Sequence, residues 1–163
     1  MDGIYELKEG KRYRDKRIII ELYHYYLQPD LNGSPSPISV MHGESISFYQ
    51  NGATMIKRSY SHGKLNGEYI YWNQDGQIKI IRNFKDDLQH GKEIIWYDNG
   101  QKYYEREYNN GQPIGIWKLW YETGELAVID DYTIEPSHFV SYKKDGSINS
   151  ESWSSKKDGL IIK

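Results

Sequence analysis

Hydrophobic and polar positions along most of this chain follow a 24-residue period that two rows of glycines mark. One row is Gly43, Gly67, Gly91 and Gly115, and the other is Gly52, Gly76, Gly100 and Gly124. The two glycines of a unit lie nine residues apart, and the four units contain no insertion. A fixed period of this length is typical of stacked repeats, in which each repeat packs only on its neighbours. We therefore expect a protein that presents a surface, without a deep catalytic pocket.

Each unit has the pattern of one β-hairpin. In the second unit a run of strand-forming residues spans 68–72, a polar turn ends at Gly76, and a second run spans 77–84. Glycine at the end of such a loop supplies the positive φ that a three-residue hairpin with a glycine bulge requires. The predicted fold is all-β: an elongated, single-layer antiparallel sheet of stacked β-hairpin repeats.

Alternation along these strands sorts the side chains onto two faces. We expect one face to be a buried core built on two aromatic ladders. These are Phe48, Trp72, Trp96 and Trp120, and then Tyr60, Phe84, Tyr108 and Tyr132. Alternation also assigns Ile56, Ile80, Tyr104 and Val128 from the second strands to this core face.

The opposite face is rich in tyrosine and varies from unit to unit, and alternation also places Glu105 and Ile129 on it. Tyrosine and tryptophan dominate interface energetics, so this face is the candidate site for a protein partner. The alternative is that the chain termini cover it. The residues predicted to bind a partner are Tyr69, Tyr71, Tyr97, Tyr103, Arg106, Trp117 and Tyr121.

The period decays at both ends of the chain, as capping units should. Residues 1–42 are expected to form an N-terminal cap, with a hairpin turning at Glu9-Gly10, a long strand at 18–27 and a Pro/Gly loop at 28–37. Residues 43–138 hold the four repeats. Residues 139–163 form a degenerate cap with a hairpin turn at 143–146 and a further segment at 160–162. Residues 1–163 are thus expected to be a single repeat domain.

Composition narrows the class of protein. A net charge of −2 and a pI near 6.2 argue against a general nucleic-acid binder, which is usually strongly basic. The chain has no cysteine, which excludes disulfides and thiolate metal sites. No stretch approaches the roughly 20 apolar residues that span a bilayer, and the first ten residues do not resemble a signal peptide. We therefore expect a cytoplasmic protein.

Arg58, Arg82 and Arg106 form a third ladder at the repeat spacing. Aligned guanidinium groups can hold phosphates or an acidic partner. The predicted register instead sets Glu44 opposite Arg58 and Glu68 opposite Arg82, as ordinary cross-strand ion pairs. Arg106 faces Lys92 in that register, and is therefore the arginine most free to bind a ligand.

The remaining ionisable groups do not predict a metal or catalytic site. His42, His90 and His138 fall on alternate units, about 20 Å apart if adjacent strands are spaced about 4.8 Å. That separation is too large for shared ligation of one metal. Asp86-Asp87 and Asp130-Asp131 are expected on a solvated connection or edge. We predict no cofactor, no metal and no catalytic residue.

The repeat consensus resembles the MORN repeat variant, the unit of YwqK-type antitoxin proteins. The resemblance is clearest at 91–115, with Trp96, Tyr97, Gly100 and Tyr108, and it extends over about 43–138. It implies a curved single-layer sheet of hairpins and a non-catalytic antitoxin or immunity role, in which the protein neutralises a partner by binding it. The alternative is a membrane-surface or scaffold adaptor, against which the near-neutral charge weighs. Asp87 replaces the glycine seen at Gly63 and Gly111, and this predicts a reshaped connection there.

Overall fold

The computed structural model describes residues 7–14, 18–28 and 37–154. Over these ranges the chain consists of β-strands joined by turns, without a helix, so none of the described residues belongs to a helix that could span a membrane. The strands are β1 (Lys8–Arg14), β2 (Ile18–Gln28), β3 (Ile38–Phe48), β4 (Thr54–Ser61), β5 (Lys64–Trp72), β6 (Ile78–Lys85), β7 (Leu88–Gln89), β8 (Gly91–Trp96), β9 (Lys102–Asn109), β10 (Gln112–Trp120), β11 (Leu126–Asp131), β12 (Ser137–Tyr142) and β13 (Ile148–Ser154).

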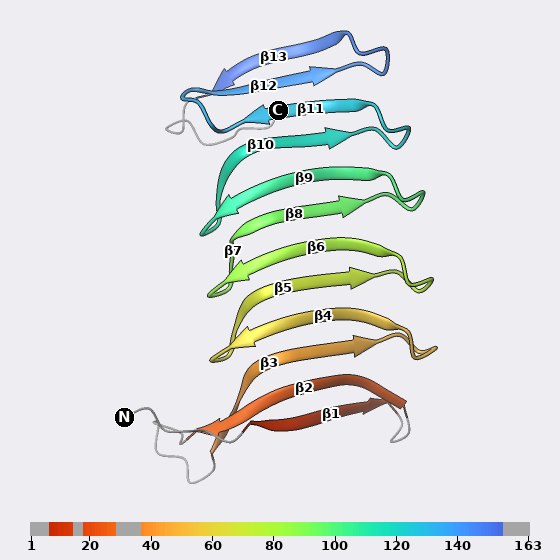
Figure 1. Cartoon of the computed structure of the whole chain (residues 1–163), viewed down its shortest axis with the longest axis vertical. Coiled ribbons are helices and arrows are strands. Elements are labelled where there is room, and N and C mark those ends of the chain that lie inside the picture. Colours follow the sequence, from red (N-terminus) through yellow and green to blue (C-terminus); the bar gives the residue numbers. More distant parts are fainter. Residues whose placement is uncertain (1–6, 15–17, 29–36, 155–163) are drawn as a thin grey trace. The chain divides into compact units, whose positions relative to one another are not determined.

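The chain forms two compact units, each an antiparallel sheet whose strands follow chain order (Figure 1). The N-terminal unit comprises Met1–Ile78 and Phe84–Leu88, and it contains β1 to β5. The C-terminal unit comprises Lys79–Asn83 and Gln89–Lys163, with the middle of β6 followed by β8 to β13. Sequential hairpins in one layer confirm the predicted all-β repeat class.

The hairpin turns have the geometry that the glycine spacing predicts. Gly52 N–H donates to the Tyr49 carbonyl at 3.0 Å, and Tyr49 N–H donates to the Ala53 carbonyl at 2.8 Å. This is a three-residue loop closed by a glycine in the left-handed region, at φ +85°. The same pair of bonds recurs at the turns that end in Gly76, Gly100, Gly124 and Gly146.

Three connections between hairpins, at 62–63, 86–87 and 110–111, are two-residue turns with both residues in the left-handed region. His62 and Gly63 have φ of 51° and 82°, and Asp86 and Asp87 have φ of 50° and 69°. The prediction of a reshaped connection at Asp87 is therefore wrong. Aspartate tolerates the left-handed region, and Asp87 Oδ1 accepts a hydrogen bond from Leu65 N–H at 2.8 Å, which stabilises the turn.

A bulge follows the hairpin turn in the second strand of the repeats. The register shifts between Ser47 and Phe48, between Ile95 and Trp96, and between Leu119 and Trp120. Two residues of the second strand then oppose one residue of the first, which interrupts the alternation of faces. The residues left without a cross-strand partner are Met55, Tyr103 and Ala127, which lie 48 and 24 residues apart and so occupy the same position of their repeats.

The bulges correct the predicted faces. Tyr104 pairs with Ile95 and Val128 pairs with Leu119, so both lie on the face that carries Tyr97 and Tyr121. We call this the tyrosine face and the opposite one the tryptophan face. Ile56, opposite Ser47 and Tyr71, and Ile80, opposite Ile95, also move to the tyrosine face. Glu105 and Ile129, which pair with Ile94 and Lys118, move to the tryptophan face.

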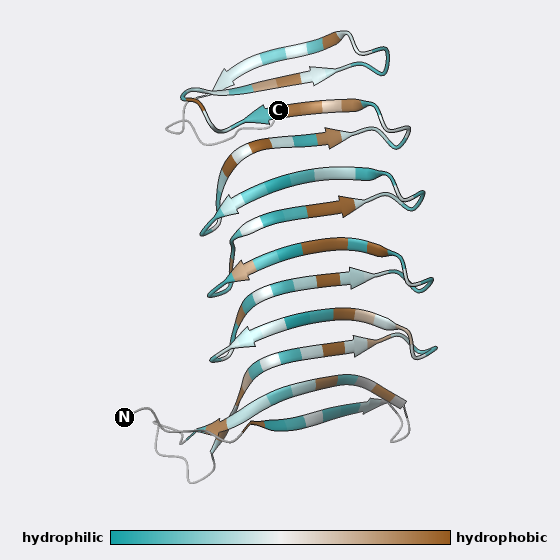
Figure 2. Ribbon diagram, viewed as in Figure 1, coloured by the Kyte–Doolittle hydropathy of each residue, from teal (hydrophilic) through white to brown (hydrophobic). Residues whose placement is uncertain are grey.

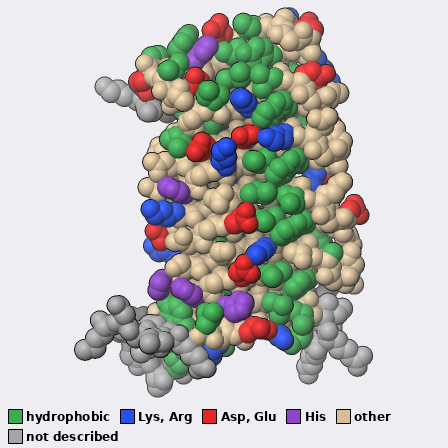
Figure 3. Space-filling model, viewed as in Figure 1, with side chains coloured by type: hydrophobic (Ala, Val, Ile, Leu, Met, Phe, Trp, Pro, Cys, Tyr) green, Lys and Arg blue, Asp and Glu red, His purple; other side chains and the backbone are tan. Residues whose placement is uncertain are grey.

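Neither face is a buried core, which is a second correction. Among the described hydrophobic side chains only Tyr26, Ala127 and Val140 are buried, and the ladder through Trp96 and Trp120 is half-exposed. Hydrophobic residues concentrate in the strand halves next to the hairpin turns (Figure 2). In the space-filling view they are interleaved with acidic and basic side chains (Figure 3). A single layer leaves both faces open because no second layer among the described residues covers them.

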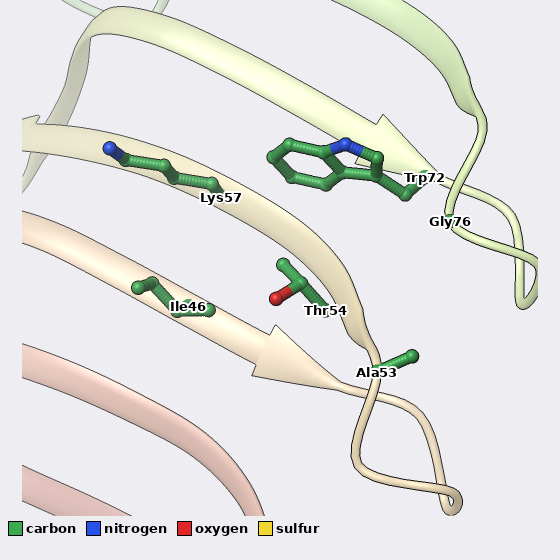
Figure 4. A pocket seen from close by; sticks show the side chains of 6 residues that line it. All are labelled: Ile46, Ala53, Thr54, Lys57, Trp72 and Gly76. Atoms are coloured by element: carbon green, nitrogen blue, oxygen red, sulfur yellow. The ribbon is translucent and has the colours of Figure 1, made fainter.

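The tryptophan face of the N-terminal unit has a shallow hollow beside the Trp72 indole. Its volume is about 410 Å³, and Ile46, Thr54 and Lys57 also line it (Figure 4). These side chains come from three neighbouring strands, β3, β4 and β5. The Trp72 indole therefore covers the side chains of β3 and β4 only in part, as expected for an aromatic ladder that is half-exposed.

Both ends of the described chain contain strands. The long strand predicted at 18–27 is β2, and the predicted fifth hairpin is β12 and β13. Glu9-Gly10 is not a turn, because both residues lie inside β1 and pair with His24 and Tyr23. Most of the predicted loop at 28–37 and the segment at 160–162 lie outside the described residues.

Candidate partner-binding face

An apolar row crosses the tyrosine face of the C-terminal unit. Successive cross-strand pairs join Ile80 to Ile95, Ile95 to Tyr104, Tyr104 to Leu119, and Leu119 to Val128. All five side chains are half-buried. Because the bulges shift the register, β6, β8, β9, β10 and β11 each contribute one apolar side chain to this row.

Tyrosines line the side of this row that lies toward the hairpin turns. The Tyr103 ring lies 4.9 Å from the rings of both Tyr97 and Tyr104. The Tyr97 hydroxyl donates to the Trp120 carbonyl at 2.9 Å, and the Tyr121 hydroxyl donates to the Tyr142 carbonyl at 2.8 Å. These bonds fix Tyr97 and Tyr121 to the next hairpin, so their rings are rigid parts of the surface.

A charged row runs along the other side of the apolar row. The carboxylate of Glu93, a residue only 3% exposed, accepts hydrogen bonds from Arg82 Nε and from Gln89 Nε2, the latter at 3.1 Å. Burial opposes the charge of Arg82, but the hydrogen bond and charge of Glu93 raise the pKa of its guanidinium. Arg82 and Glu93 therefore form a half-buried ion pair.

Arg106 lies next in this row and stacks on aromatic rings. Its guanidinium carbon lies 4.0 Å from the centroid of Tyr104 and 4.9 Å from the centroid of Trp117. Among the described residues no carboxylate oxygen lies within ion-pair distance of it. Trp117 in turn contacts Tyr108 and Tyr132, each at 4.9 Å, and its indole N–H donates to backbone carbonyls.

The arginine register predicted from the sequence is wrong in detail. Arg82 pairs with Glu93, not Glu68, and Arg106 lies opposite Glu93, not Lys92. In the N-terminal unit Arg58 pairs with Glu21, at 2.7 Å, and Glu44 binds Lys57 instead. The structure nevertheless leaves Arg106 as the arginine of the ladder without an ion pair within the described ranges.

A hollow of about 220 Å³ adjoins Arg106 and Trp117. Leu119, Val128 and Phe139 form its apolar lining, and Lys118, Asp130 and Tyr132 complete it. Burial raises the pKa of the Asp130 carboxyl group, although the Tyr132 hydroxyl donates to it at 2.6 Å. Burial and this acidic neighbour in turn raise the pKa of Tyr132.

The N-terminal unit has its own buried carboxylate on the tyrosine face. Glu21 accepts hydrogen bonds from Arg58 at 2.7 Å and Ser45 at 2.9 Å, and it pairs with Arg12 at 3.0 Å. Burial opposes the charge of Glu21, but these hydrogen bonds and cations outweigh it and lower the pKa of the carboxyl group. The Glu21 carboxylate is thus fully engaged by its own unit, although the buried Nε of Arg58 has no hydrogen-bond partner among the described residues.

The seven residues predicted to bind a partner fall into two sets. Tyr69 and Tyr71 belong to the N-terminal unit, where Tyr69 packs 6.3 Å from Phe84 and the Tyr71 hydroxyl lies 3.1 Å from that of Tyr49. The other five share the tyrosine face of the C-terminal unit. There the structure brings together Tyr97 with Tyr103, and Arg106 with Trp117.

Two of the three repeated histidines, His42 and His90, accept hydrogen bonds from turn residues, and the third stacks on a neighbouring strand. His42 Nδ1 accepts a hydrogen bond from His62 N–H at 3.3 Å, and His90 Nδ1 accepts one from Asn110 N–H at 3.4 Å. His138 stacks on Trp153, with ring centroids 4.0 Å apart. Within the described ranges no three His, Asp or Glu side chains are grouped as metal ligands.

Sequence reasoning missed two groups of functional interest, the apolar row and the hollow beside Arg106. No residue type in the sequence marks the bulges, because the extra residues Met55, Tyr103 and Ala127 have nothing in common except their position in the repeat. For Asp130 the signal was its position 24 residues after Arg106, where an aspartate replaces the arginine of the ladder Arg58, Arg82 and Arg106.

Comparison with known proteins identifies the repeat. The family model for the MORN repeat variant matches residues 41–62, 65–86, 89–110 and 113–133, more than half of the chain. No curated protein matches the sequence.

Two solved structures show only weak similarity. One is the GtfA/B complex bound to UDP and GlcNAc, at 10% identity and a TM-score of 0.29; the match covers 80% of this chain and 24% of that one. The other is a protein of unknown function from Bacteroides fragilis, at 5% identity and a TM-score of 0.20, with 94% and 95% of the two chains covered. Scores this low carry no argument about fold or function.

Proposed function

Because the chain belongs to the MORN repeat variant family, we propose that it is a non-catalytic repeat protein that binds a partner protein on the tyrosine face of its C-terminal unit. The finer proposal is an antitoxin-like or immunity-like role, in which binding neutralises the partner. The resemblance of the repeats to YwqK-type antitoxin units supports this role.

The observation that carries the proposal is the uncovered apolar row between the tyrosines and the charged row. Ile95, Tyr104, Leu119 and Val128 form a continuous strip, yet none of them is buried. Aromatic anchors beside apolar side chains are the groups that dominate protein interfaces. Covering this strip with a partner would remove apolar surface from water at about 25 cal/mol per Å².

Rigid tyrosines favour binding further. The hydroxyls of Tyr97 and Tyr121 are held by backbone carbonyls of the following hairpin. A partner that packs on these rings therefore immobilises few additional side chains, and each immobilised side chain would otherwise cost about 0.5–1.5 kcal/mol. This preorganisation distinguishes the tyrosine face from a surface of flexible polar side chains.

The test compares two ring deletions on opposite faces of the same unit. Tyr103→Ala removes a half-buried ring from the tyrosine face, and Trp120→Ala removes one from the tryptophan face. Each tagged variant and the wild type are used for affinity capture from cells of the native host, with quantitative mass spectrometry. Circular dichroism confirms that both variants fold.

The expected result is one dominant protein that is retained by the wild type and by Trp120→Ala and is lost with Tyr103→Ala. Retention by Tyr103→Ala, or equal loss with both variants, would contradict the assigned face. The neutralising role is tested by expressing the captured protein alone and together with this chain. Growth inhibition that co-expression relieves is expected, and a captured protein that does not affect growth would refute the antitoxin role.

A further inference from the structure

The ladder of three arginines is asymmetric in its partners. Arg58 is neutralised by Glu21 and Arg82 by Glu93, and both carboxylates are buried. Arg106 occupies the equivalent repeat position, but Arg82 and Gln89 already occupy the Glu93 carboxylate. Among the described residues, the third guanidinium of the ladder therefore lacks the carboxylate that the other two have.

The surroundings of Arg106 hold it in place without a direct ion pair; its acidic neighbour Asp130 has a pKa that burial raises and that the charge of Arg106 only partly lowers. Tyr104 and Trp117 contact the guanidinium through their rings. A stacked guanidinium keeps its in-plane N–H groups for hydrogen bonds, and their fork geometry matches a carboxylate. Forming a surface ion pair costs the conformational entropy of the side chains. The rings already restrict Arg106, so a ligand that pairs with it would cost less of this entropy.

The hollow beside Arg106 adds an apolar contact to the charged one. Leu119, Val128 and Phe139 line it, and its volume of about 220 Å³ suits a single aliphatic or aromatic side chain. A ligand that fills it would therefore carry hydrocarbon next to its negative charge. Inorganic phosphate lacks that hydrocarbon.

We propose that Arg106 and the adjoining hollow bind an acidic-apolar segment of the partner protein, with a carboxylate on the guanidinium and a neighbouring apolar side chain against Leu119, Val128 and Phe139. The inference rests on the proposed protein-binding function and names the chemistry that the partner presents. Asp130 lies at the same hollow and limits the charge that it accepts. A singly charged carboxylate is therefore favoured over a doubly charged phosphate.

The experiment titrates the isotope-labelled full chain with N-acetyl-leucine at pH 7 and follows the side-chain Nε–H signal of Arg106 and the methyl signals of Leu119 by NMR. N-acetyl-leucinamide has the same side chain without the charge. Inorganic phosphate has the charge without the side chain. These three probes separate the two parts of the proposed site.

Four variants test the residues. Arg106→Gln removes the cation and Arg106→Lys keeps the charge without the fork. Asp130→Asn removes the competing acid. Lys92→Gln is the matched control, because it removes an exposed cation of the same unit from the tryptophan face.

The expected result is saturable binding of N-acetyl-leucine that Arg106→Gln weakens by about tenfold or more, since a charge-assisted bidentate pair is lost. The affinity of Arg106→Lys for N-acetyl-leucine should lie between those of the wild type and Arg106→Gln. Asp130→Asn should raise this affinity, and Lys92→Gln should leave it unchanged. Equal binding of the amide, tighter binding of phosphate, or no effect of Arg106→Gln would overturn the proposal. If N-acetyl-leucine fails to bind but the captured partner is still lost with Tyr103→Ala, only this inference is refuted, and the proposed function remains supported.

Discussion

Replacing Glu93 by glutamine should destabilise the C-terminal unit far more than the same change at Glu105. The two residues lie on adjacent strands, β8 and β9, and point to opposite faces. Glu93 has a side chain that is 4% exposed, and it accepts bonds from Arg82 and Gln89. Glu105 has a side chain that is 30% exposed, and it binds Lys102 at 2.8 Å.

The expected magnitudes follow from burial. A hydrogen bond between charged groups contributes about 1.5–3 kcal/mol, and a fully buried cation left without its partner costs about 3–5 kcal/mol. The Arg82 side chain is 31% exposed and glutamine still offers an oxygen, so Glu93→Gln should cost about 2 kcal/mol. An exposed pair contributes about 0.2–1 kcal/mol, so Glu105→Gln should cost about 0.5 kcal/mol or less.

Urea unfolding at pH 7, followed by tryptophan fluorescence, measures both free energies of unfolding. For a chain of this size, about 2 kcal/mol corresponds to a fall in Tm of roughly 4–8 °C. Hydrogen exchange of β8 and β9 locates the loss. Equal costs for the two variants, or a cost below about 0.5 kcal/mol for Glu93→Gln, would refute the assignment of Glu93 as a buried structural anion.

Three further predictions test other parts of the structure. The pKa of Glu21 is lowered in the folded chain, so its contribution to stability is complete above about pH 4.5 and is lost as the pH falls through its folded pKa. Urea titrations between pH 7 and pH 3 should show a weaker acid dependence for Glu21→Gln than for the wild type. The pKa of Asp130 is instead raised by burial, so folding favours its neutral form, and ionisation of this group lowers the free energy of unfolding as the pH rises above the unfolded pKa of 3.8. Asp130→Asn should then raise Tm at pH 7 and leave it unchanged below the unfolded pKa, and a lower Tm at pH 7 would contradict this reasoning. Gly100→Ala should cost about 1 kcal/mol in urea unfolding because φ is +85°, although a Cβ there would meet no atom within 4 Å. Gly100→Asn should cost less, and a neutral Gly100→Ala would contradict the turn geometry.

The fold class could be predicted from the sequence because it depends on local turn chemistry that the repeat makes visible. Gly52 and its counterparts mark each three-residue loop, and the strands on either side follow from it. The assignment of side chains to faces depends on a feature that the glycines do not mark. One unpaired residue after each turn shifts the alternation, so Tyr104 and Val128 move to the tyrosine face.

The candidate site was predicted only in part, for the same reason. The predicted face is right for Trp117 on β10, for Tyr97 and Tyr121 directly after β8 and β10, and for Tyr103 at the bulge. Ion-pair partners depend on cross-strand register to within one residue, so the sequence placed Glu68 where the structure uses Glu93. The hollow beside Arg106 requires β12 as well, and no local pattern predicts how Phe139 packs.

Photocrosslinking shows directly whether the tyrosine face contacts a protein in cells. The photoreactive residue p-benzoylphenylalanine is placed at position 103, on the tyrosine face, or at position 120, on the tryptophan face, and cells of the native host are irradiated. We expect one dominant protein adduct from position 103 and none from position 120. An adduct from position 120 alone, or no adduct from either position, would contradict the claim that the tyrosine face binds a protein.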